Sequence, residues 1–148
     1  MSVSDTSAAS QHETITFEFD LKHPPEKVWR ALTQPELLAE WLLPTIGFKL
    51  EPGAAFKLQA PSFPDWDGTV SCKLLEVEPH RLLKYTWVVG DKLIDTVVTF
   101  TLTPVATGTR LSLVQTGFKP ENKPAFGGQR YGWKLMGGKL VDLLQRLS

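Results

Sequence analysis

The sequence predicts an α+β fold in which a curved antiparallel β-sheet of about six to seven strands wraps around a long C-terminal helix. Three observations lead to this prediction. Residues 14–21 have the pattern of a strand, and two short helices are predicted after it, before residue 44. Strand-like runs recur across residues 46–116, and a long helical period occurs only in residues 129–147. Because an antiparallel sheet buries one face and only one long helix is available to cover it, we expect the sheet to curve around that helix.

The first strand and the two short helices follow from residues 14–44. Apolar side chains alternate with polar ones along residues 14–21, as is typical of a half-buried strand. The prolines at residues 24–25 end this strand and are well placed in the first turn of a helix. The run Thr-Gln-Pro-Glu at residues 33–36 predicts a capping box that opens a second short helix, which Pro44 ends. The inward side chains of the two helices are Val28, Trp29, Leu32, Leu37, Leu38, Trp41 and Leu42.

Six further runs have the composition and spacing of short strands. They are residues 46–51, 54–60, 68–78, 81–89, 93–103 and 110–116. Turn-forming residues separate them, which predicts an antiparallel meander with tight turns. Within residues 70–77 the apolar phase slips by one position, so we expect a β-bulge near Leu74 and Leu75 that helps the sheet to curl.

The last segment is an amphipathic helix over residues 129–147, preceded by a Pro- and Gly-rich loop at residues 119–128. Its apolar stripe consists of Trp133, Met136, Gly137, Leu140, Leu144 and Leu147. Gly137 stands where a leucine would pack better, and glycine costs about 1 kcal/mol relative to alanine inside a helix. Either another part of the chain presses close there or a space is left there. Gly138 lies off the stripe, and a bend in the helix is the one role that its position suggests.

The composition is that of one globular domain. The chain has 148 residues, 42% hydrophobic and 22% charged content and no net charge, so no bulk field favours nucleic acid. Residues 1–78 carry 6 basic and 12 acidic side chains, and residues 79–148 carry 10 basic and 4 acidic ones. We interpret the two halves as neutralising each other within one fold. We expect residues 1–13 to be a disordered leader and residues 14–148 to be a single domain. The single cysteine and the lack of an export signal or a long apolar run favour a cytoplasmic protein without a membrane span.

Several segments resemble the family of activators of heat-shock protein 90 ATPase (AHSA1-like), within the SRPBCC or START-like superfamily. They are Val28 to Leu38 with Trp41, Gly68-Thr69-Val70, Leu75-Glu76-Val77, residues 81–87, 96–102 and 108–113, Gly117-Phe118 and Gly132-Trp133. The resemblance covers residues 14–147, as a single AHSA1-like SRPBCC domain. It implies the helix-grip (START/Bet v 1-like) fold, which agrees with the arrangement predicted above.

The chain departs from the family pattern at three places. The run Gly53-Ala54-Ala55 stands where the family usually has two glycines, Gln115 stands where a histidine is common, and Gly137 stands where an aliphatic residue is common. In the eukaryotic activator a second domain does much of the chaperone binding. The resemblance therefore implies the fold more directly than it implies a chaperone partner.

Motifs of catalysis are sparse. His12, His23 and His80 have no metal-ligand spacing, and Cys72 reads as a small buried hydrophobe. A nucleophile elbow, a phosphate loop and a dinucleotide fingerprint are all missing from the sequence. We therefore predict no catalytic residue, no metal ligand and no cofactor.

Aromatic residues are the unusual feature, with five Trp, eight Phe and two Tyr. On the inward phases they would supply the walls of a hydrophobic cleft between the sheet and the last helix. The predicted ligand-binding residues are Trp29, Trp41, Phe56, Leu58, Trp66, Tyr85, Trp87, Thr96, Val98, Phe100, Gln115, Phe118, Trp133, Gly137 and Leu140. The loop of residues 62–67, which contains Phe63 and Trp66, is either a lid over this cleft or a contact surface for another protein.

Three functions remain open from the sequence. The first is binding of a small hydrophobic ligand, such as a lipid or a polyketide- or flavonoid-like molecule, in a stress-related role. The second is a chaperone-associated interaction protein of the heat-shock protein 90 ATPase activator type. The third, a cavity enzyme of the cyclase or hydrolase type, is the least favoured because the inward phases offer few titratable groups. We expect the protein to be a monomer or a weak homodimer. Its expected binding partner is a small hydrophobic molecule.

Overall fold

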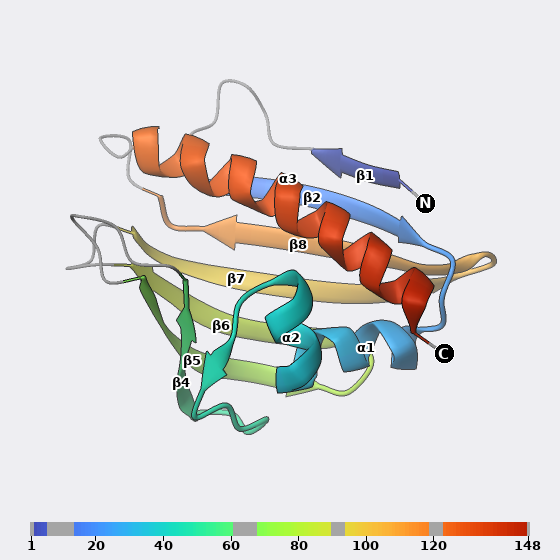
Figure 1. The fold of residues 1–148 in the computed structure, drawn as a ribbon, viewed down its shortest axis with the longest axis horizontal. Coiled ribbons are helices and arrows are strands. Elements are labelled where there is room, and N and C mark those ends of the chain that lie inside the picture. Colours follow the sequence, from blue (N-terminus) through green and yellow to red (C-terminus); the bar gives the residue numbers. More distant parts are fainter. Residues whose placement is uncertain (1, 6–13, 61–67, 90–93, 119–122, 148) are drawn as a thin grey trace.

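The fold is known from a computed structural model that describes residues 2–5, 14–60, 68–89, 94–118 and 123–147 (Figure 1). Its strands are β1 (Ser2–Asp5), β2 (Thr14–Leu21), β3 (Thr45–Ile46), β4 (Ala55–Gln59), β5 (Thr69–Glu78), β6 (Leu82–Val89), β7 (Ile94–Val105) and β8 (Gly108–Thr116). Its helices are α1 (Pro25–Thr33), α2 (Pro35–Trp41) and α3 (Lys123–Arg146). The predicted order of strand, two short helices, strands and long helix is confirmed.

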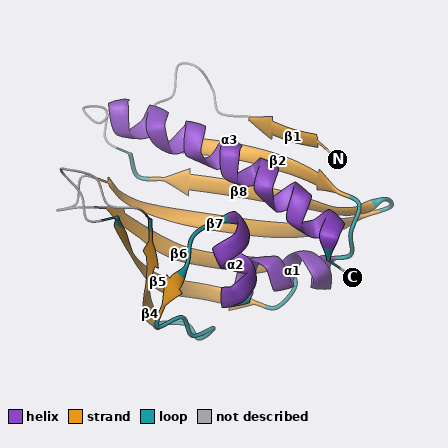
Figure 2. Ribbon diagram, viewed as in Figure 1, coloured by secondary structure: helices purple, strands orange, loops and turns teal. Residues whose placement is uncertain are grey.

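All strands join one antiparallel sheet with the order β1-β2-β8-β7-β6-β5-β4-β3. Strands β3 to β8 form the predicted meander, and β2 pairs with the last strand, so that Ile15 lies opposite Gln115. The three helices lie on one face of the curved sheet, with α3 running along β2 and β8 and with α1 and α2 beside it (Figure 2). This is the helix-grip arrangement, and the side chains between sheet and helices form the hydrophobic core.

The bulge is where the apolar phase predicted it. The pairing of β5 with β6 shifts register between Leu74 and Glu76, and Leu75 is therefore exposed while Leu74 is fully buried. One extra residue in a strand increases its local twist and bends it. The bulge thus contributes to the curvature that the predicted fold requires.

Four local predictions are wrong. Ser2–Asp5 are not disordered but pair with β2 as an edge strand, which covers backbone groups that β2 would otherwise leave open. Thr33 does not cap α2, because it is still the last residue of α1, where its hydroxyl donates to the Trp29 carbonyl at 2.8 Å. Gln34 takes the N-cap position without a side-chain hydrogen bond. Helix α3 begins at Lys123 instead of residue 129, since the first helical turn tolerates a proline. Of the strand expected at residues 46–51, only Ile46 is paired, in the two-residue strand β3.

The charge division between the two halves of the sequence is neutralised across the fold. Four ion pairs among the described residues each join an acidic group of the first half to a basic group of the second. They are Glu78–Arg81, Glu76–Lys84, Asp20–Arg110 and Glu40–Arg146. Because all four lie at the surface, each contributes at most about 1 kcal/mol.

Gly138 has no packing role among the described residues. It is exposed on α3, and a Cβ built there meets nothing within 4 Å. We therefore expect Gly138→Ala to raise the free energy of unfolding by about 1 kcal/mol, through helix propensity alone. Urea denaturation measures this gain. Gly132→Ala is a second case, since its Cβ would make only an ordinary contact with the end of Met136, and a loss of stability in both variants would contradict the argument.

The junction between β2 and α1 ties the C-terminal end of α3 to the sheet. Lys27 Nζ lies 3.1 Å from His23 Nδ1 and donates to the Leu147 carbonyl at 2.7 Å. The Thr109 hydroxyl donates to the His23 carbonyl at 2.7 Å. Burial and the neighbouring Lys27 charge both lower the pKa of His23, because a second positive charge would face the ammonium group.

This arrangement predicts a loss of stability in mild acid. Since the pKa of His23 is lower in the folded than in the unfolded chain, its contribution is present above the ordinary histidine pKa and is lost as the pH falls through the folded value. We expect the melting temperature to fall between roughly pH 7 and pH 5. His23→Gln should flatten this part of the profile. An unchanged profile in the variant would contradict the assignment.

Candidate functional site

The interior between sheet and helices contains a continuous set of aromatic contacts. This aromatic cluster consists of Trp41 from α2, Phe56 from β4, Tyr85 and Trp87 from β6, Phe100 from β7 and Trp133 from α3. Adjacent ring centroids lie between 5.2 and 6.3 Å apart, and most pairs are tilted or edge-to-face. Half-buried Phe48 extends the cluster at 4.9 Å from Phe56. The rings gather because alternate residues of β4, β6 and β7 point to the same face of the sheet.

A chain of buried hydrogen bonds runs beside these rings. Trp133 Nε1 donates to Gln115 Oε1 at 2.7 Å, and Gln115 Nε2 donates to Thr96 Oγ1 at 2.8 Å. The Thr96 hydroxyl in turn donates to the Trp87 carbonyl at 2.9 Å. Because an indole can only donate, it fixes the orientation of the Gln115 amide. This polar chain joins α3 to three neighbouring strands in the middle of an apolar core.

The indole of Trp87 differs from those of Trp41 and Trp133. Trp41 Nε1 donates to the Ala31 carbonyl at 2.7 Å, and Trp133 is held by Gln115. Trp87 is only 2% exposed, and its Nε1 has no hydrogen-bond partner within the described ranges of the chain. A buried donor without a partner costs about 1–3 kcal/mol. The site therefore contains a polar group whose requirement the described residues do not meet.

Titratable side chains of the described core are Cys72 and Tyr85. Burial raises the pKa of the Cys72 thiol to about 12 and raises that of the Tyr85 hydroxyl well above its ordinary value. Both groups are therefore neutral near pH 7, and neither serves as a base or as an anionic nucleophile there. The described residues also contain no group of three or more His, Cys, Asp or Glu side chains arranged to hold a metal ion.

The structure brings most of the predicted binding residues together. Those that are buried in the core between sheet and helices are Trp29, Trp41, Phe56, Leu58, Tyr85, Trp87, Thr96, Val98, Phe100, Gln115, Phe118, Trp133, Gly137 and Leu140. Trp66 and the loop of residues 62–67 lie outside the described residues. Phe48 and Leu143 are not among the predicted binding residues, although Leu143 is fully buried on α3 beside the predicted stripe.

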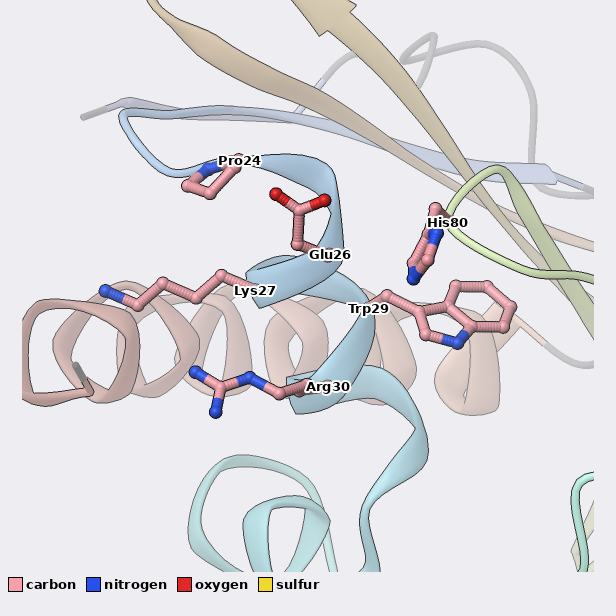
Figure 3. Close-up of a pocket in the computed structure, with 6 residues that line it drawn as sticks. All are labelled: Pro24, Glu26, Lys27, Trp29, Arg30 and His80. Atoms are coloured by element: carbon pink, nitrogen blue, oxygen red, sulfur yellow. The ribbon is translucent and has the colours of Figure 1, made fainter.

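Trp29 is buried as well, but among the described residues no ring contact joins it to the aromatic cluster. It lines a surface depression of about 610 Å³ together with Pro24, Glu26, Lys27, Arg30 and His80 (Figure 3). Its ring lies 6.1 Å from that of His80, edge-on. Lys27 and Arg30 project to the opposite side of α1 from this pair (Figure 3). The charged and aromatic groups therefore do not converge on one ligand position.

Among the described helices, none combines the length and the hydropathy that crossing a lipid bilayer requires.

Comparison with known proteins relates this architecture to one family. The sequence profile described as "Activator of Hsp90 ATPase homolog 1-like protein" matches residues 22–145. The chain is 45% identical to protein MLL2253 from Mesorhizobium loti over 91% of this chain and 98% of that one, with a TM-score of 0.83. It is 28% identical to protein CV1439 from Chromobacterium violaceum over 93% and 100%, with a TM-score of 0.78.

A more distant similarity extends over nearly the whole chain. CalU16 from Micromonospora echinospora is 23% identical over 98% of this chain and 85% of that one, with a TM-score of 0.75, which indicates a shared fold. Comparison with the curated proteins gave no match.

Proposed function

The chain belongs to the family of Activator of Hsp90 ATPase homolog 1-like proteins, and from this membership and the core described above we propose that it binds a small hydrophobic ligand between the sheet and α3. Three features support this function. They are the aromatic cluster, the polar chain beside it, and Gly137 on the buried face of α3. Ligand sites of this type are mostly apolar and contain a few oriented polar groups.

Gly137 is the observation that carries the proposal. It is buried one helical turn after Trp133 and one turn before Leu140, both of which are fully covered. Residues three and four apart share one face of a helix, so Gly137 lies on the face that packs on the sheet. Its side chain there is a single hydrogen atom. A helix that only had to close the core would gain about 2 kcal/mol from a leucine there.

The energy for binding comes from burial. At about 25 cal/mol per Å², covering roughly 300 Å² of ligand surface yields about 7 kcal/mol before the costs of ordering the complex. Neutral aromatic, polyketide-like or lipid molecules suit a site whose buried walls are apolar.

Replacing Gly137 tests the proposal. We expect Gly137→Leu to raise the melting temperature and to weaken binding of flavone or 1-dodecanol by about tenfold, since the leucine occupies the ligand's volume. Binding is followed by ¹H–¹⁵N chemical-shift changes in the protein. Gly138→Leu is the matched control, because it makes the same change on the exposed side of α3 and should leave binding unaltered.

Two results would contradict the proposal. A lower melting temperature for Gly137→Leu would mean that a neighbouring group presses against the glycine. If none of flavone, 1-dodecanol and 9-fluorenone changes any chemical shift of the unaltered protein, an apolar ligand site is excluded.

A chaperone-associated role is the second candidate. Its support is the family itself and an exposed apolar pair on α3, since Tyr131 and Leu135 are 64% and 52% exposed and lie one turn apart. Stimulation of a heat-shock protein 90 ATPase by the unaltered protein, and its loss in Tyr131→Lys with Leu135→Lys, would favour this role. Ligand binding should persist in the same double variant.

A further inference from the structure

We infer that Trp87 Nε1 selects the ligand by donating a hydrogen bond to a neutral oxygen acceptor, so that the bound molecule is an apolar, aromatic ketone or a compound with an equivalent carbonyl. The inference rests on the proposed function and adds the chemical class that the site distinguishes.

The first argument is the unmet donor. An indole N–H has no acceptor capacity, so an acceptor is the one group that completes it. Trp87 Nε1 is buried and has no partner among the residues that the structure describes. A group that approaches it from the interior with a lone pair therefore recovers a hydrogen bond that an apolar ligand of the same shape leaves unmade.

The second argument is that the neighbouring polar groups already have partners. The Gln115 oxygen accepts from Trp133, and its amide nitrogen donates to Thr96. Thr96 lies opposite Trp87 across β6 and β7, but its hydroxyl proton is given to the Trp87 carbonyl and not to a ligand. Of the polar chain and the rings around it, Trp87 Nε1 is the buried nitrogen that has no hydrogen-bond partner at all among the described residues.

The third argument concerns charge. The buried polar side chains of the described core are Thr96, Thr109 and Gln115, and none of the described core side chains carries a positive charge. A carboxylate placed beside Trp87 would lose its hydration without gaining a counter-ion. A neutral carbonyl needs one donor and no counter-ion, which is what this part of the site provides.

The fourth argument is that aromatic rings lie next to the Trp87 indole. Trp87 packs against Trp133 with ring centroids 5.2 Å apart at 50°, and Trp133 packs against Phe100 at 6.1 Å. Flat rings match such walls, and contacts between aromatic rings add specificity beyond the buried area. An aryl ketone thus satisfies both the walls and the donor.

The test compares 9-fluorenone with fluorene, which share a ring system and differ in a carbonyl against a methylene group. We expect the unaltered protein to bind 9-fluorenone about tenfold more tightly than fluorene, and Trp87→Phe to bind the two equally. In the unaltered protein the indole N–H resonance of Trp87 should move downfield with 9-fluorenone and much less with fluorene. This resonance gives a readout even if Trp87→Phe fails to fold.

Trp29→Phe is the matched control, because it makes the same change in the surface depression. It should leave the preference for 9-fluorenone intact. Equal binding of both compounds to the unaltered protein would overturn the inference while leaving the proposed function standing. A preference that survives Trp87→Phe, or that is lost in Trp29→Phe, would also overturn it. Binding of neither compound would overturn the inference and exclude aryl ligands from the proposed function.

Discussion

Gln115→Leu is expected to lower the free energy of unfolding by about 3 kcal/mol, although leucine has a similar size and is more apolar. The change removes two buried hydrogen bonds and leaves the Trp133 indole without its acceptor. Unpaired buried donors cost more than the net value of the bond that held them. Urea denaturation followed by far-ultraviolet circular dichroism measures the loss.

A second substitution separates this mechanism from a simple packing defect. When Trp133→Phe is added to Gln115→Leu, the indole donor disappears together with its lost acceptor. Trp133→Phe should therefore lower the free energy of unfolding less in the Gln115→Leu variant than in the unaltered protein. The expected difference is about 1–2 kcal/mol. Additive losses would mean that the hydrogen bond between α3 and β8 contributes little.

Gly108→Ala is the other substitution with a large expected effect, a loss of about 3 kcal/mol. Gly108 starts β8 with φ at +148°, and a Cβ there would overlap the Leu21 carbonyl oxygen and lie 2.7 Å from the His23 nitrogen. Both obstacles are backbone atoms at the end of β2, which cannot turn away as a side chain can. Thermal and urea unfolding should both report the loss.

Gly53→Ala is the matched control for backbone strain. Gly53 has φ at +87°, but a Cβ there meets nothing within 4 Å. Its substitution should therefore cost only the strain of the left-handed conformation, about 1 kcal/mol. Equal losses in the two variants would mean that the contact of the β7–β8 turn with β2 is not close.

The sequence was sufficient to predict the architecture because its patterns are long. Alternation along the strands, the slip at Leu74 and the single long helix each extend over several residues. The failures are local. Helix α1 extends through Thr33, which moves the N-cap of α2 to Gln34. The pairing of Ser2–Asp5 depends on β2 being exposed as an edge.

For the candidate site as well, the sequence predicts which side chains point inward but not which groups they contact. Strand phase was enough to predict that Tyr85, Phe100 and Gln115 point inward, and the structure confirms their burial. Phase cannot identify hydrogen-bond partners, since these depend on strands that are distant in the sequence. Thr96 meets Gln115 because β7 pairs with β8. Trp29 also follows an inward phase and is buried, but phase could not show that it lines a surface depression with His80 as well.

The neighbours of β2 in the sheet have a consequence for the order of folding during synthesis. The longer partner β8 leaves the ribosome after every other strand of the described sheet, so Leu21 of β2 must wait for Thr109. Pairing between such distant segments is slow. β1 is the only neighbour of β2 in the described sheet that is already synthesised when β2 emerges. The short strand of Ser2–Asp5 can therefore occupy one edge of β2 during elongation and reduce its exposure to other nascent chains.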